Sequence, residues 1–105
     1  MYLFERGKGK TVVLLHGANP VSYFDDLVEA LAEGRRVVVP HLPGWGNSPP
    51  LSAGQGFDVT TEALGQALLE AGIDRASVLG YSLGGWRALQ LALSGGIEVE
   101  SVYLL

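Results

Sequence analysis

Short runs of apolar residues rich in valine and leucine recur along the chain, set off by glycine, proline or charged residues. The first run is Thr11 to Leu15, which stops at His16-Gly17. A short apolar run without polar alternation is typical of a strand that is buried on both faces of a parallel sheet. Three further segments share this character and predict further strands: residues 35–40, 76–80 and 99–105.

The segments between these runs carry apolar residues at helical spacing instead. The first helical segment, residues 21–34, ends at Gly34, and the second starts with Asp58 as a capping residue and ends at Gly72. A third helix is expected over residues 83–93. The apolar positions that define the first two helical faces are Phe24, Leu27, Val28 and Leu31, then Val59, Ala63, Leu64, Ala67, Leu68 and Ala71.

Strands that alternate with helices indicate an α/β fold, with a mostly parallel sheet and helices on both of its faces. The opening residues 2–5, which run into a glycine-rich turn at 7–9, predict an additional antiparallel edge strand. Residues 41–56 are rich in glycine and proline and predict a long loop. The chain shows no linker or longer repeat, so we expect residues 1–105 to belong to one domain.

Composition narrows the class of protein. Of the 105 residues, 48% are hydrophobic and 17% are charged, which is typical of a globular domain. The formal net charge is -4 and the basic residues are scattered, so nucleic acid is not an expected partner. The absence of cysteine rules out a disulfide scaffold, and no apolar stretch is long enough to predict a membrane span. Without a secretion signal at its start, the chain is expected to be cytoplasmic.

No bound metal or cofactor is expected either. The two histidines lack the helical spacing and the clustered carboxylates that a metal site needs. No strand is followed by a phosphate-binding glycine loop of the required spacing, so a nucleotide cofactor is not indicated.

Residues 80–84 read Gly-Tyr-Ser-Leu-Gly and place Ser82 between a predicted strand and a predicted helix. The pattern G-x-S-x-G is weak evidence by itself, because a glycine-rich chain produces it by chance. The context fits a strained turn that exposes the serine hydroxyl, since Gly80 and Gly84 remove the collisions that side chains would make. The competing interpretation is an ordinary strand-to-helix turn with a solvent-exposed serine.

Two backbone N–H groups are candidates for stabilising negative charge near this serine. Leu83 lies at the start of the predicted helix, where N–H groups lack helical partners, and Ala18 lies in the loop that Gly17 opens. His16 and His41 follow strand ends at the same edge of the sheet, where α/β folds bind their ligands. We interpret His16 as a structural imidazole that is hydrogen-bonded to the loop backbone, in preference to a catalytic base.

Three motifs in this order, LLHGANP, VVVPHLPGWGNS and LGYSLGGW, resemble the N-terminal half of the α/β-hydrolase fold superfamily, and the resemblance covers Thr11 to Leu105. It implies an incomplete α/β-hydrolase fold in which Ser82 is the nucleophile of the elbow. It further implies that Ala18 and Leu83 offer oxyanion-hole N–H groups, and that three glycines shape the elbow and the loop: Gly17, Gly80 and Gly84.

The resemblance has one departure and one consequence for the reaction. His41 stands where the family more usually has an aspartate that helps to hold the loop, and we interpret His41 as solvated or loop-bonding rather than catalytic. Trp45 either lines a pocket or only packs the loop onto the sheet. A serine at the elbow, where the dehalogenase-like and epoxide-hydrolase-like branches have an aspartate, implies acyl transfer to water. The implied enzymes are esterases, lipases, thioesterases or carbon–carbon bond hydrolases, acting on a small acyl or ester substrate.

The proton acceptor for Ser82 is not evident. In this superfamily the chain order is serine, acid, histidine, yet no aspartate or histidine follows Ser82. We therefore expect the acid and the base to lie beyond Leu105, in a missing C-terminal half. This leaves a serine hydrolase that is catalytically incomplete in the present chain, or else a non-catalytic fragment or partner-dependent half-domain. A dyad of Ser82 with His16 is a third hypothesis.

Overall fold

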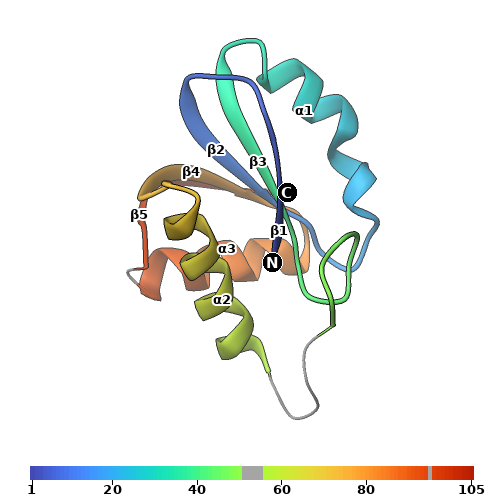
Figure 1. Ribbon diagram of the computed structural model, residues 1–105, viewed down its shortest axis with the longest axis vertical. Helices are drawn as coiled ribbons and strands as arrows, with labels where there is room; N and C mark the ends of the chain where they lie inside the picture. Colours follow the sequence, from blue (N-terminus) through green and yellow to red (C-terminus); the bar gives the residue numbers. More distant parts are fainter. Residues whose placement is uncertain (51–55, 95) are drawn as a thin grey trace.

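The computed structural model in Figure 1 contains one five-stranded sheet, with the strand order β1-β3-β2-β4-β5. It describes residues 1–50, 56–94 and 96–105, without the side chains of residues 57 and 58. Strands β2, β3, β4 and β5 are parallel to one another, and β1 runs antiparallel along β3. The strands are β1 (Tyr2–Arg6), β2 (Lys10–Leu15), β3 (Arg35–His41), β4 (Arg75–Gly80) and β5 (Glu98–Leu104). The predicted α/β fold with a mostly parallel sheet is confirmed.

Helices cover both faces of this sheet (Figure 1). A short 3-10 turn, η1 (Val21–Phe24), leads into α1 (Asp25–Leu31) on one face. Helices α2 (Phe57–Glu70) and α3 (Leu83–Ser94) pack together on the opposite face. None of the helices in the described part of the chain is long and apolar enough to cross a membrane.

The core has two layers because successive strand residues point to opposite faces. In β2, Val12 and Leu14 pack in the layer under α1, whereas Val13 and Leu15 pack in the layer under α2 and α3. Both layers are almost fully buried. The unbroken apolar run from Thr11 to Leu15 is therefore a consequence of having helices on both sides of the sheet.

The antiparallel edge strand predicted over residues 2–5 is present as β1, which pairs with β3 and places Tyr2 opposite His41. One local expectation is wrong in detail. Helix α2 begins at Phe57 with Gly56 at its N-cap, so Asp58 lies inside the first turn and not at the cap. The part of the predicted loop at 51–55 lies outside the described residues.

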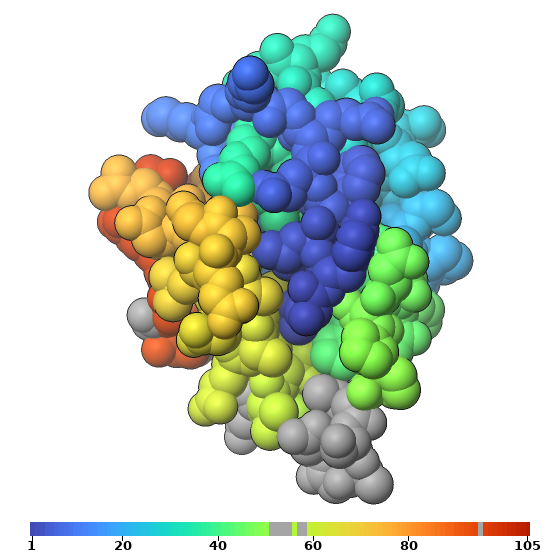
Figure 2. Space-filling view, viewed as in Figure 1, coloured from blue at the N-terminus to red at the C-terminus, as the bar shows by residue number. Residues whose placement is uncertain are grey.

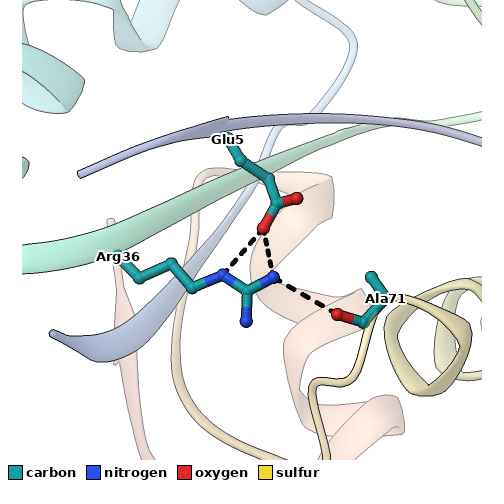
Figure 3. Close-up of polar contacts among 3 residues, drawn as sticks. All are labelled: Glu5, Arg36 and Ala71. Atoms are coloured by element: carbon teal, nitrogen blue, oxygen red, sulfur yellow. Dashed lines mark hydrogen bonds and ion pairs between the residues drawn. The ribbon is translucent and has the colours of Figure 1, made fainter. Parts of the chain in front are cut away.

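Arg36 links the edge strand to a helix end, as Figure 3 shows. Its Nε donates a hydrogen bond to Glu5 Oε1 at 2.7 Å, and its Nη2 donates to the carbonyl of Ala71 at 3.3 Å. Ala71 is the C-cap of α2, where unpaired carbonyls and the helix dipole favour a cation. Strand β1 lies at the surface in Figure 2, so this bridge attaches an exposed strand to the rest of the fold.

Candidate active site

The turn at Ser82 holds a strained backbone. Strand β4 ends at Gly80 and α3 begins at Leu83, which leaves only two residues to reverse the chain. Ser82 has a φ of 54° and is the one non-glycine residue in the described part of the chain with a positive φ. A residue with a Cβ adopts this conformation only at a cost, and such outliers gather at functional sites. The strain and the exposure of Ser82 favour the elbow over an ordinary turn.

The two glycines of the turn permit close backbone packing. A Cβ on Gly80 would lie 2.6 Å from the Gly85 Cα, and a Cβ on Gly84 would lie 2.8 Å from the His16 carbonyl oxygen. Real Cβ atoms essentially never come this close to another heavy atom. Both positions therefore need glycine if α3 is to start directly above the end of β4.

The backbone of the turn is also hydrogen-bonded to neighbouring strands. The N–H of Tyr81 donates to the Leu15 carbonyl at 3.0 Å, and the N–H of Ser82 donates to the Leu105 carbonyl at 3.1 Å. Both groups of the turn are thus held by residues that are distant in the sequence.

The loop after β2 lies against this turn, as the parallel order of the strands predicts. A Cβ on Gly17 would lie 2.8 Å from the Tyr81 carbonyl oxygen and 3.2 Å from both the Leu83 nitrogen and the Ser82 Cβ. The two backbones are therefore in direct contact, and a larger residue than glycine would separate them.

Asn19 organises the same loop from within. Its Oδ1 accepts the N–H of Gly17 at 2.8 Å, and its Nδ2 donates to the carbonyl of Pro20 at 3.1 Å. The Gly17 N–H is thereby occupied, which leaves the N–H of Ala18 as the next donor along the loop. The structure brings Gly17, Ala18, Ser82 and Leu83 together at one edge of the sheet.

A cleft of about 280 Å³ opens beside these residues. Trp45 lies on its wall and meets the His16 ring edge-on, with centroids 5.6 Å apart, so it both lines the pocket and packs the loop. The described residues that line the cleft are His16, Gly17, Ala18, Leu42, Pro43, Trp45, Gly56, Thr60, Leu83 and Arg87.

His16 is a structural imidazole, as we expected. Its Nδ1 donates to the Gly17 carbonyl at 2.8 Å, and its Nε2 accepts the N–H of Leu42 at 3.2 Å. Burial lowers the pKa of His16 below its ordinary value; the bond to Gly17 opposes this in part, and the charge of Arg87 makes a smaller lowering contribution. A neutral ring whose two nitrogens are both engaged cannot also accept the proton of Ser82.

His41 holds the loop after β3. Its Nδ1 accepts the N–H of Asn47 at 3.0 Å, its carbonyl accepts the hydroxyl of Ser48, and its ring lies 4.6 Å from that of Tyr2. Burial, and secondarily the charge of His16, lower the pKa of His41. His41 therefore bonds to its own loop, as the loop-bonding interpretation predicts.

Arg87 is a residue of the cleft that sequence reasoning missed. It lies in α3, is only 7% exposed, and burial lowers the pKa of its guanidinium. The sequence did show a charged residue, Arg87, among the apolar positions of a predicted helix. Whether its side chain reaches the cleft depends on how α3 packs against the sheet, which the sequence alone does not give. No group of three or more histidine, aspartate or glutamate side chains that could hold a metal is present among the described residues.

The sequence model of the alpha/beta hydrolase fold matches residues 10–105, and the chain belongs to this family. It is 37% identical to a 2-hydroxy-6-oxononadienedioate/2-hydroxy-6-oxononatrienedioate hydrolase of Cupriavidus pinatubonensis, over 91% of this chain and 35% of that protein. It is 30% identical to a 2-hydroxy-6-oxo-6-phenylhexa-2,4-dienoate hydrolase of Burkholderia cepacia, over 100% of this chain and 39% of that protein.

A comparison with solved structures also points to the alpha/beta hydrolase family. The crystal structure of an alpha/beta hydrolase family protein from Desulfitobacterium hafniense superimposes with a TM-score of 0.88 at 29% identity, over 98% of this chain and 43% of that one. The chain thus spans between a third and a half of the length of these proteins. The match confirms an incomplete α/β-hydrolase fold with the N-terminal strands and helices in place.

Proposed function

We propose that this chain carries the nucleophile of a serine hydrolase that cleaves acyl bonds through a covalent acyl-enzyme. The observation that carries the proposal is the positive φ of Ser82, held between Gly80 and Gly84 at the junction of β4 and α3. This conformation costs stability and is tolerated where it exposes a reactive group. The membership of the chain in the hydrolase family supports the same reading.

In the proposed reaction the Ser82 hydroxyl oxygen attacks a carbonyl carbon and its proton passes to a general base. The carbonyl oxygen becomes an oxyanion in the tetrahedral intermediate. Collapse of this intermediate expels the leaving group, which takes a proton from the base. Water then hydrolyses the acyl-enzyme by the same route and restores the hydroxyl.

The oxyanion would be bound by the N–H groups of Ala18 and Leu83. Leu83 is the first residue of α3, where N–H groups lack a helical acceptor and the dipole favours negative charge. Both residues line the cleft, and the contact of Gly17 with the turn brings their backbones close. Removing one donor of such a pair costs about 10²–10³ in kcat.

The base would come from outside the described cleft. Both nitrogens of His16 are engaged, His41 holds its own loop, and no histidine follows Ser82 in the sequence. We propose that residues outside these 105 supply the acid and the histidine, a C-terminal half being the natural source. The substrate class we propose is a small ester or other acyl compound, which includes the carbonyl-flanked carbon–carbon bonds suggested by the names of the relatives.

A fluorophosphonate probe tests the nucleophile directly, both in the 105-residue chain and in the longest protein that its gene encodes. We expect Ser82-dependent labelling and ester hydrolysis in the longer protein, and neither in the chain alone. Ser82→Ala should abolish both activities, whereas Ser94→Ala, an exposed serine at the far end of α3, should leave them intact.

The alternative function is a non-catalytic half-domain that acts through a partner chain. Its support is the engagement of both histidines, which leaves Ser82 without an evident base. Failure of the longer protein to label or to hydrolyse any activated ester would favour this alternative. Ser82-dependent hydrolysis by the 105-residue chain alone would instead show that an internal base exists.

A further inference from the structure

Two tyrosines meet beside the candidate nucleophile. Tyr23 belongs to η1, which follows the loop of Gly17 and Ala18, and Tyr81 directly precedes Ser82. Their rings are tilted by 30° with centroids 4.5 Å apart, which is a favourable geometry for an aromatic pair. The pair therefore joins the two backbone segments that would form the oxyanion hole.

The pKa of Tyr23 is raised, first by side-chain hydrogen bonding to Tyr81 and then by the charge of Tyr81, as expected for two tyrosines this close together. Tyr23 is 54% exposed, so burial does not explain why its ring lies against Tyr81. The neighbouring Phe24 is 1% exposed, which anchors η1 in the core. Its ring meets the Tyr23 ring edge-on, with the two centroids 5.7 Å apart, and this contact limits the positions that the Tyr23 ring can take.

An oxyanion hole made from two separate segments needs a fixed spacing between them. The contact of Gly17 with the turn sets only a lower limit, because van der Waals repulsion prevents the backbones from closing but not from moving apart. Catalytic geometry must hold to within about 0.5 Å. The bond from the Tyr81 N–H to the Leu15 carbonyl holds the end of β2 to the turn, but it leaves the loop beyond His16 to be held by other contacts.

We propose that Tyr23 and Tyr81 are positioning residues that hold the Ala18 loop against the Ser82 turn at the spacing needed for oxyanion binding. Tyr81 is bonded to Ser82, and the N–H of Tyr23 donates to the Pro20 carbonyl at 3.0 Å, so each ring is connected to one half of the hole. Asn19 links Pro20 back to Gly17. Neither ring lines the cleft, so neither needs to touch the substrate. This inference rests on the proposed serine hydrolase function.

The test compares Tyr23→Leu, which removes the ring, with Tyr23→Phe, which keeps the ring and removes the hydroxyl. Steady-state hydrolysis of an activated ester is measured in the longest protein that the gene encodes, with Ser82→Ala as the reference for background. Tyr23→Leu should lower kcat by about tenfold or more and leave KM within about twofold, since misplacement by a fraction of an ångström weakens transition-state binding alone. Tyr23→Phe should recover most of that loss.

Tyr103→Leu is the matched control. Tyr103 lies on β5 and is 55% exposed, about as much as Tyr23, and its replacement should leave kcat unchanged.

Two results would overturn the proposal: a Tyr23→Leu variant with wild-type kcat, or a change in KM alone, which would indicate substrate contact. Activity that survives Ser82→Ala would refute the serine hydrolase function itself, which is a separate outcome.

Discussion

Gly17 lies against Ser82 at the ends of two adjacent strands, so that a Cβ on Gly17 would lie only 3.2 Å from the Ser82 Cβ. This contact couples the loop after β2 to the turn after β4. A change in either segment must therefore disturb the other, and the expectations below start from that coupling.

Gly17→Ala should damage both stability and the site. The new methyl would lie 2.8 Å from the Tyr81 carbonyl oxygen, so the loop must move, at a cost of about 1–3 kcal/mol in unfolding free energy. Urea unfolding measures the cost, and fluorophosphonate labelling reports the displaced loop. Gly34→Ala is the control, because nothing lies within 4 Å of its added Cβ and the substitution should be neutral or slightly stabilising. Equal losses for the two variants would contradict the contact.

Ser82→Gly and Ser82→Ala should both abolish labelling but differ in stability. Glycine accepts the φ of 54° without strain, whereas alanine keeps the Cβ and the strain. Glycine loses more backbone entropy on folding than alanine, which offsets part of this relief of strain. On balance we expect the unfolding free energy of Ser82→Gly to exceed that of Ser82→Ala by about 0.5–1 kcal/mol. Thermal and urea unfolding of the two variants give the difference. A more stable alanine variant would show that the turn is not strained.

The buried histidines should make the fold sensitive to mild acid. Burial lowers the pKa of both His16 and His41, so in the folded protein they stay neutral below the ordinary value of about 6.5. The unfolded chain takes up protons first as the pH falls through 6.5, and the stability that these histidines contribute above that pH is lost between 6.5 and their folded pKa values.

Unfolding midpoints in urea between pH 8 and pH 5 measure this dependence. The wild-type protein should lose stability over the lower half of this range, and His16→Gln should show a shallower slope because it has no proton to gain. A wild-type protein that becomes more stable between pH 7 and pH 5.5 would contradict the expected sign.

Arg36 should contribute more to stability than a typical surface arginine. It bridges Glu5 and the C-cap of α2, and its side chain is 30% exposed. Arg36→Met should cost about 1 kcal/mol, and part of this cost should disappear in high salt. Arg6→Met removes the ion pair of Arg6 with Glu29, whose side chains are 51% and 64% exposed, and should cost much less. Similar effects of the two substitutions would indicate that the bridge to Ala71 contributes little.

Much of the fold could be predicted because it depends on local pattern. The apolar run at Thr11 to Leu15 predicts a strand covered on both faces, and in the structure its residues pack in both core layers. The partner of β1 could not be predicted in the same way. Pairing with β3 depends on a non-local crossover that the residues 7–9 do not encode, and any exposed edge would offer the same backbone groups.

The candidate site likewise has a part that depends on local pattern and a part that depends on distant contacts. Ser82 and its glycines were accessible to sequence reasoning because a sharp turn restricts which residues can occupy it. The roles of Asn19, Tyr23 and Arg87 were not, because they depend on the direction of side chains whose partners lie on other elements. The bonds of His16 agree with the structural interpretation, but its partner Leu42 comes from a different strand end.

The hydrogen bonds of the turn have a consequence for the order of folding. Tyr81 donates to Leu15 and Ser82 donates to Leu105, so the turn is closed by strands that lie before and after it in the chain. Contacts of this kind stabilise the chain only after the entropy cost of closing the intervening loops has been met. The unusual backbone of Ser82 is therefore stable only once β2 and β5 have joined β4. A chain in which these strands have not paired would lack the bonds that hold Ser82 at its positive φ, so the strained turn is a product of the assembled sheet.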